Sequence, residues 1–186
     1  MPSTVDICNR ALSRIGSARI TSLTDDTKPA RACNSAFSMV RDEVLRAHPW
    51  NSAISRASLA KLADDPLFGY DAQYQLPGDC LRVLEVYDST EPWVVEGGKI
   101  LCEEGTPLSI RYIRQEEDTE AWDSLLTSAV AARMAVEVCE EITQSNTKRE
   151  AATREYEQIL ARARMADGQE QSPMPFEEDA WINARY

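Results

Sequence analysis

The chain has 186 residues, of which 43% are hydrophobic and 27% are charged, and its formal net charge is −11. This length and composition are typical of one soluble globular domain with its own core. No apolar run approaches the roughly 20 residues needed to cross a bilayer, and the first residues show no signal peptide. We therefore expect a protein made and kept in a cytoplasm. The acidity excludes general binding to nucleic acid or anionic membrane through phosphate neutralisation.

The first predicted element is an amphipathic helix over residues 3–16. Ser3 or Thr4 can cap its first turn with a hydroxyl group, and apolar side chains follow at helical spacing. Gly16 supplies the left-handed residue that commonly ends a helix. The short polar connection that follows favours an antiparallel partner helix.

The second predicted helix covers residues 28–48. Thr27 can cap it, and Pro29 lies in the first turn, where a missing N–H costs nothing. Pro49 ends the helix because its ring disfavours helical geometry at His48. We expect the His48 imidazole to satisfy carbonyl groups at this helix end.

The middle of the chain changes to a strand pattern. Residues 54–62 fit either a short helix or an irregular strand, and the sequence does not decide between them. From about residue 70 to 114, short β-branched or aromatic runs alternate with Gly and Pro turn signals, which predicts a small antiparallel β insert. The clearest hairpin turns at Gly97-Gly98, and the alternation along residues 108–113 indicates one buried face.

Two further helices are predicted after the β insert. A broad apolar stripe without Gly or Pro predicts a helix over residues 119–143. A polar break follows at 144–146. Thr147 and Glu150 then form a capping-box pattern that opens a last helix over residues 147–166.

The predicted fold class is α+β: one domain over residues 1–166, in which a bundle of about four helices packs together and the antiparallel sheet projects from one end. Residues 167–186 have no helical or strand period and are expected to form an extended C-terminal arm. This acidic segment carries an unusual apolar load: Met174, Phe176, Trp181, Ile182 and Tyr186. Because aromatic residues are enriched where one protein anchors on another, a docking arm that uses these five side chains is favoured over a frayed tail.

The chain offers little material for a metal or catalytic site. Its five cysteines are scattered without a CxxC pair, which favours reduced, mostly buried thiols. With His48 as the single histidine, a His-rich metal site cannot be built, and a catalytic triad would have to centre on a residue wedged at a helix end. We therefore expect no metal, no cofactor and no enzymatic activity.

One enzymatic alternative stays open. Acidic residues flank the β insert: Glu103, Glu104, Glu116, Glu117 and Asp118. Two carboxylates placed across a sugar cleft could cleave peptidoglycan. A solvated acidic loop is the favoured interpretation, because carboxylates over residues 116–120 also suit the positive N-terminal end of the helix that follows.

Several segments occur in a recognisable order along residues 3–166. They are Cys8–Gly16, Ile20–Leu23, the run from Asp25 to the His48-Pro49-Trp50-Asn51 turn, Tyr74–Val83, Glu96–Leu101 and Ser145–Lys148. In this order they resemble the head-to-tail adaptor proteins of short-tailed bacteriophages, the tail tubular protein A group of portal–tail accessory factors. The segment after Met165 matches this family least well.

The resemblance implies a structural virion protein. A dodecameric ring would bind beneath the portal protein, extend the DNA channel and present a platform for the tail nozzle and for tailspike or fibre proteins. DNA would pass through the channel, during retention and ejection, without sequence-specific binding; the excess acid fits a lining that repels DNA as well as it fits solubility. The protein would reside in the virion tail or neck after assembly in the host cytoplasm. An interaction module of another assembly is the remaining non-enzymatic alternative.

Overall fold

The computed structural model describes residues 2–87, 92–103 and 107–170. The helices are α1 (Thr4–Arg14), α2 (Lys28–Ala47), the 3-10 turn η1 (Asn51–Ala53), α3 (Ser124–Thr143) and α4 (Asn146–Gln169). The strands are β1 (Ile54–Leu59), β2 (Ala72–Gln75), β3 (Cys80–Val86), β4 (Val94–Glu96), β5 (Lys99–Cys102) and β6 (Leu108–Arg114). The α+β class predicted from the sequence is confirmed.

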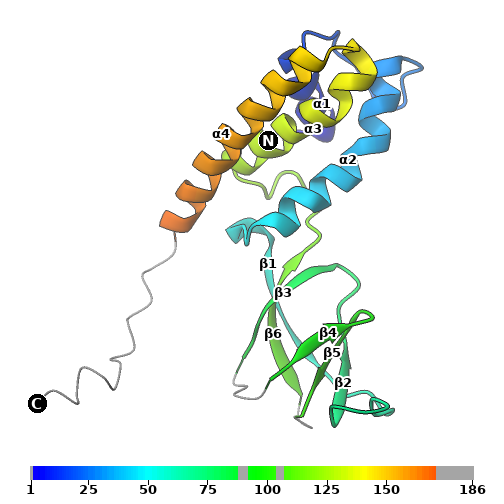
Figure 1. Ribbon diagram of the computed structural model, residues 1–186, viewed down its shortest axis with the longest axis vertical. Coiled ribbons are helices and arrows are strands. Elements are labelled where there is room, and N and C mark those ends of the chain that lie inside the picture. The colour runs from blue at the N-terminus through cyan, green and yellow to red at the C-terminus, as the bar shows by residue number, and fades with distance from the viewer. Residues whose placement is uncertain (1, 88–91, 104–106, 171–186) are drawn as a thin grey trace, which may run out of the picture.

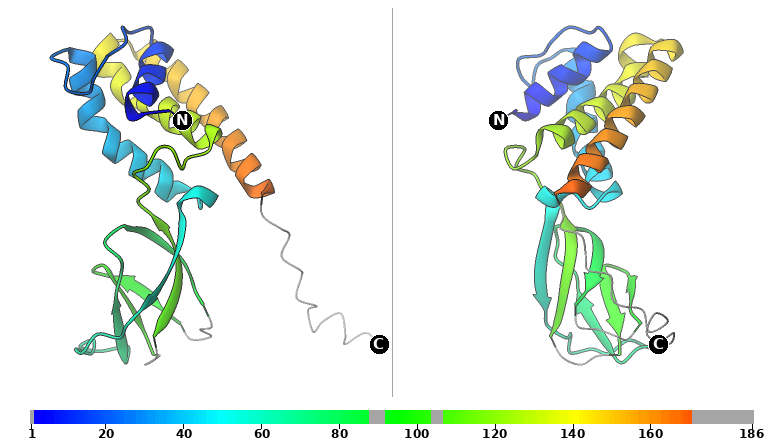
Figure 2. Two further views of the ribbon diagram at one scale, coloured as in Figure 1. Left: turned by 180° about the vertical axis from the view of Figure 1, so that it is seen from behind. Right: turned by 90° about the vertical axis from the view of Figure 1, so that its left-hand side faces the viewer.

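The helices gather at one end of the molecule and the strands at the other (Figure 1). We call residues 54–114 the β part and the rest of the described chain the helical part. α3 packs against α1, α2 and α4, whereas α1 and α2 touch each other little. β1 leaves the helical part from η1, and β6 returns to it ahead of α3. The β part is therefore a projection inserted between α2 and α3, as the views in Figure 2 also show.

Local hydrogen bonds set the ends of α1 and α2. The Ser3 hydroxyl accepts from the Asp6 N–H at 3.2 Å, and the Asp6 carboxylate accepts from the Ser3 N–H at 2.9 Å. The Thr27 hydroxyl accepts from the Ala30 N–H at 3.3 Å, which confirms the second predicted cap. α2 ends where predicted, because His48 before the proline is extended, with φ of −146°.

α3 and α4 begin at other residues than the sequence suggested. α3 starts at Ser124, because the Asp123 carboxylate accepts from backbone N–H groups of the first turn. Residues 119–123 therefore form turns rather than helix. The cap of α4 is Ser145 rather than Thr147: the Ser145 hydroxyl accepts from the Lys148 N–H at 3.4 Å.

Two three-stranded antiparallel sheets make up the β part: sheet A has the order β1–β6–β3, and sheet B has the order β2–β5–β4. Their inner faces share a core formed by Leu59, Ala72, Tyr74, Val86, Ile100, Cys102, Leu108, Ile110 and Tyr112. The predicted buried face of residues 108–113 is confirmed. The predicted hairpin is confirmed as well, since Gly97 and Gly98 join β4 to β5 with φ of 55° and 77°.

The β part begins earlier than the predicted boundary near residue 70. Residues 54–59, which the sequence left undecided, form β1 and pair with β6 from Ile54↔Ile113 to Leu59↔Leu108. This segment is a strand because it pairs with β6, which lies far along the chain. Its own periodicity does not decide its structure.

The larger hydrophobic core lies in the helical part, with buried residues from all four α-helices. Trp50 and Ile113 extend it to the base of the β part. Cys8 and Cys33 belong to this core, and four of the five cysteines are buried, as predicted. The contact with Cys33, together with burial, raises the pKa of the Cys8 thiol. No α-helix among the described residues is long and apolar enough to cross a membrane.

Candidate interaction sites at the junction and the tip

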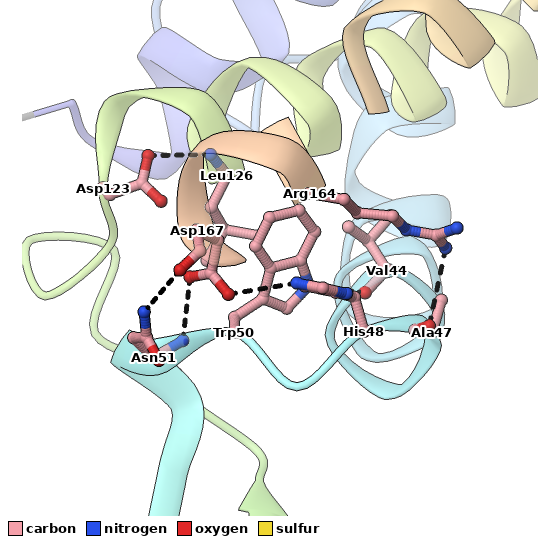
Figure 3. A network of polar contacts seen from close by, with 9 residues as sticks. All are labelled: Val44, Ala47, His48, Trp50, Asn51, Asp123, Leu126, Arg164 and Asp167. Atoms are coloured by element: carbon pink, nitrogen blue, oxygen red, sulfur yellow. Dashed lines mark hydrogen bonds and ion pairs between the residues drawn. The ribbon is translucent and has the colours of Figure 1, made fainter. Parts of the chain in front are cut away.

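The end of α2, the turn η1 and the end of α4 meet where the helical part joins the β part (Figure 3). Trp50 is fully buried there, and its indole Nε1–H donates to the Val44 carbonyl at 2.9 Å. The last turn of a helix leaves carbonyls without an intrahelical partner. Trp50 therefore satisfies one such carbonyl and fixes the bend by which α2 leads into β1.

Asp167, near the end of α4, is the centre of this junction. Its side chain is 4% exposed. Oδ1 accepts from the Asn51 N–H at 3.0 Å, and Oδ2 lies 3.0 Å from Nε2 of His48. The Asp167 carbonyl accepts from the Asn51 side-chain amide at 3.0 Å. Because a carboxylate only accepts hydrogen bonds, His48 carries a proton on Nε2 in this arrangement.

Two predictions about these residues were wrong. His48 does not satisfy helix-end carbonyls through this nitrogen; its ring bonds to Asp167 and lies edge-on to the Trp50 ring, with centroids 4.7 Å apart. Asp167 does not begin the arm, because α4 continues to Gln169. Asp167 lies one helical turn after buried Ala163, but a charged residue adds nothing to an apolar period, so the continuation of α4 left no clear signal in the sequence.

Further contacts fix the β part to α2. Arg46 donates to the Leu81 carbonyl of β3. Gln115, directly after β6, donates to Oδ2 of Asp42 at 2.6 Å. β3 and the segment directly after β6 are thus both bonded to α2, so the projection has a defined orientation.

The acidic residues considered for peptidoglycan cleavage are Glu103, Glu104, Glu116, Glu117 and Asp118. Glu104 lies outside the described residues. Glu116 is buried and pairs with Arg114, while Glu117 pairs with Arg41 at 3.3 Å. These two carboxylates hold the connection after β6 and give the hydrolase alternative no support. Within the described ranges, no group of three or more His, Cys, Asp or Glu residues is placed to hold a metal ion.

The most exposed apolar side chains lie in the connection between β1 and β2. Leu67 is 98% exposed and Phe68 is 85% exposed. Figure 1 shows this connection at the end of the β part away from the helices, and we call Pro66–Phe68 the tip. A groove of about 450 Å³ runs beside it and is lined also by Leu101 and Lys99. The sequence analysis missed the tip, because three residues are too few to show a period.

The five predicted arm residues, Met174, Phe176, Trp181, Ile182 and Tyr186, lie outside the described residues. The docking-arm hypothesis therefore stays a prediction. The junction nevertheless fixes its origin, since Asp167 bonds the end of α4 to the base of the β part only a few residues before the arm begins.

No protein-family model matches the chain, and no curated protein is significantly similar to it in sequence. The resemblance to phage adaptors therefore rests on the ordered segments quoted above.

Proposed function

We propose that this chain is a structural subunit of the head-to-tail adaptor ring of a short-tailed bacteriophage, placed between the portal and the tail nozzle. The ordered segment resemblance motivates the proposal. The single structural observation that supports it most is the tip, where Leu67 and Phe68 are exposed at the end of a projection. Large apolar side chains exposed side by side commonly mark contact with another protein.

In the proposed ring the two parts have different tasks. We interpret the four helices as a stiff bundle whose sides meet neighbouring copies through a repeated head-to-tail interface. The β part carries the tip toward nozzle, tailspike or fibre proteins, and the arm after α4 docks on the portal. The channel passes DNA without reading its sequence, which suits a chain with a net charge of −11.

Native mass spectrometry of the full chain, alone and mixed with its portal ring, tests the proposal. We expect one copy to bind per portal subunit, giving a closed ring. Absence of any complex with the portal would contradict the adaptor role. Clearing of purified cell wall that disappears on Glu116→Gln would instead support the hydrolase alternative.

The junction dictates how the arm should be removed. A truncation before Asp167 would break the bonds to Asn51 and His48 and so confuse loss of the arm with damage to the fold. A chain that ends at Glu170 keeps α4 intact. We expect this chain to fold normally and to bind the portal at least tenfold more weakly; full binding without residues 171–186 would overturn the docking-arm hypothesis.

A further inference from the structure

The outer face of sheet A places two arginines directly opposite each other. Arg56 of β1 and Arg111 of β6 are paired in the register. Their chain neighbours Ala57 and Ile110 face the core between the sheets, so the arginines are on the opposite, outer face. Like charges at directly opposed positions destabilise a sheet unless an anion lies between or beside them.

Only one of these two guanidinium groups has a carboxylate partner among the described residues. Glu85 of β3 lies 3.5 Å from Arg111. Arg56 is exposed, and within residues 2–87, 92–103 and 107–170 no carboxylate lies within ion-pair distance of it. Arg56 therefore stands opposite a second arginine with no carboxylate of the described residues to neutralise it.

A groove follows the same face. Its volume is about 350 Å³, and the lining residues that belong to the outer face are Arg56, Ser58, Tyr87, Ser109 and Arg111. Tyr87 is 55% exposed at this site. The groove therefore combines positive charge with one exposed aromatic ring, and an acidic peptide with aromatic side chains would complement both properties.

We propose that this groove binds the chain's own segment Phe176–Trp181. The segment contains three consecutive carboxylates, Glu177, Glu178 and Asp179, between two aromatic residues. The carboxylates neutralise Arg56 and share Arg111 with Glu85, and an aromatic ring packs against Tyr87. This contact belongs to the free chain and uses only its own residues, and docking of the arm on the portal, as proposed above, would have to displace it.

The junction makes the contact possible within the same molecule. Asp167 bonds to Asn51, so the start of the arm and the start of β1 are adjacent. From Asn51 to Arg56 an extended chain spans at most about 17 Å, whereas from Glu170, directly after α4, to Glu177 it spans up to about 24 Å. The arm is long enough, and a short tether of this kind gives an effective local concentration on the order of millimolar.

Fluorine NMR of the full chain with 5-fluorotryptophan tests the proposal. The chain has four tryptophans, and Trp181→Phe identifies the resonance of the arm. We expect the Trp181 signal to be displaced from its position in urea. Arg56→Glu should abolish this displacement without harming the fold, because it creates an opposite-charge pair with Arg111. Arg19→Glu is the matched control, since Arg19 is exposed in the loop after α1 and undergoes the same charge change.

A charge exchange separates electrostatic binding from a structural effect. Combining Arg56→Glu with Glu177→Lys and Glu178→Lys should restore the displaced signal. A Trp181 signal at its unfolded position in the unaltered chain would overturn the proposal, as would a displaced signal that Arg56→Glu leaves unchanged. A displacement that grows with protein concentration would also overturn it, by showing that a second copy supplies the segment.

Discussion

The helical part and the β part differ in how much of their apolar surface they bury. The helical part contains the larger core. The β part is smaller, yet five of the eight large hydrophobic side chains found exposed among the described residues belong to it: Leu67, Phe68, Tyr87, Trp93 and Val95. Single exposed hydrophobic residues are ordinary, but Leu67 and Phe68 are adjacent and almost fully exposed, which is typical of a contact surface. The helical part thus supplies stability, and the β part offers surface for contacts.

Arg133 in the helical part and Arg56 in the β part also differ in their ion pairs. In the helical part Arg133 of α3 bonds to Glu43 of α2 at 2.9 Å and to Glu137 at 2.8 Å. Although burial opposes it, these two carboxylates raise the pKa of Arg133. In the β part Arg56 has no such partner within the described residues. Arg133 thus joins α2 to α3, whereas Arg56 stands on the outer face of sheet A, where the proposed segment would meet it.

The strongest test of the comparison removes Trp50, which belongs to the helical core and supports the base of β1. Trp50→Ala deletes a fully buried indole and should lower the free energy of unfolding by about 3–5 kcal/mol. Trp50→Phe keeps a ring but loses the bond to the Val44 carbonyl, and should cost about 1–3 kcal/mol. Urea unfolding followed by circular dichroism measures both.

The matching substitution in the β core is Tyr74→Ala, which also removes a fully buried ring. It should cost about 3–5 kcal/mol as well. Because the junction bonds the two parts together, we expect a single unfolding transition in both variants. Two transitions, of which only one shifts in Tyr74→Ala, would show that the two parts unfold independently. The junction would then not join them into one cooperative unit.

The junction itself is tested at Asp167, whose buried carboxylate accepts from Asn51 and bonds to His48. Asp167→Ala leaves these partners without an acceptor and should cost about 2–3 kcal/mol. The larger effect should be local: faster hydrogen exchange at the Asn51 amide and along the last turn of α4. Exchange that accelerates equally across the whole chain would argue against a local joint. Asp26→Ala, at an exposed position, is the control.

Substitutions at the tip should leave the stability almost unchanged and should weaken binding instead. Leu67→Ser and Phe68→Ser alter side chains that are 98% and 85% exposed, so the free energy of unfolding should change by no more than about 0.5 kcal/mol. Binding to the tail-side partner should weaken, by about tenfold for Phe68→Ser, in a pull-down or calorimetric titration. A clear loss of stability would mean that the tip packs on its own chain and is not a contact surface.

The smallest expected effect is on the pH dependence of stability. Backbone N–H groups of Ser22 and Thr21 donate to the Asp25 carboxylate at 3.0 and 2.9 Å and hold its pKa below the ordinary value. A lowered folded-state pKa stabilises the fold above about pH 4, and this contribution is lost as the pH falls toward the folded pKa. Asp25→Asn should flatten that part of the stability profile. Thr21→Val, which removes only the hydroxyl donor, should move the Asp25 pKa part of the way up in an NMR titration.

Features that depend on neighbouring residues could be predicted from the sequence. The caps at Ser3 and Thr27 and the turn at Gly97-Gly98 are decided within a few residues, and all three are as predicted. The end of α2 before Pro49 is equally local. Such features follow from backbone sterics and short-range hydrogen bonds, which can be inferred from a few neighbouring residues of a single sequence.

Features that depend on distant partners could not be predicted. β1 is a strand because β6 pairs with it, and its own residues fit two periods. Asp167 resembles a surface acid beside Gly168, and only the contact with Asn51 and His48 reveals its role. The tip and the pairing of Arg56 with Arg111 likewise exist only once strands far apart in sequence are aligned.

The register between β1 and β6 determines which part of the chain could be replaced without disturbing the helices. Ile54 and Ile113, the first and nearly the last residues of the β part, are opposite each other on adjacent strands, and such opposed residues have Cα atoms about 5 Å apart. The helical part is therefore continuous in space although it is interrupted in sequence. Everything between these two residues could be exchanged for another hairpin or closed with a short turn, leaving the four helices in register. The β part is in this sense an insertion whose two ends lie side by side at the helical part.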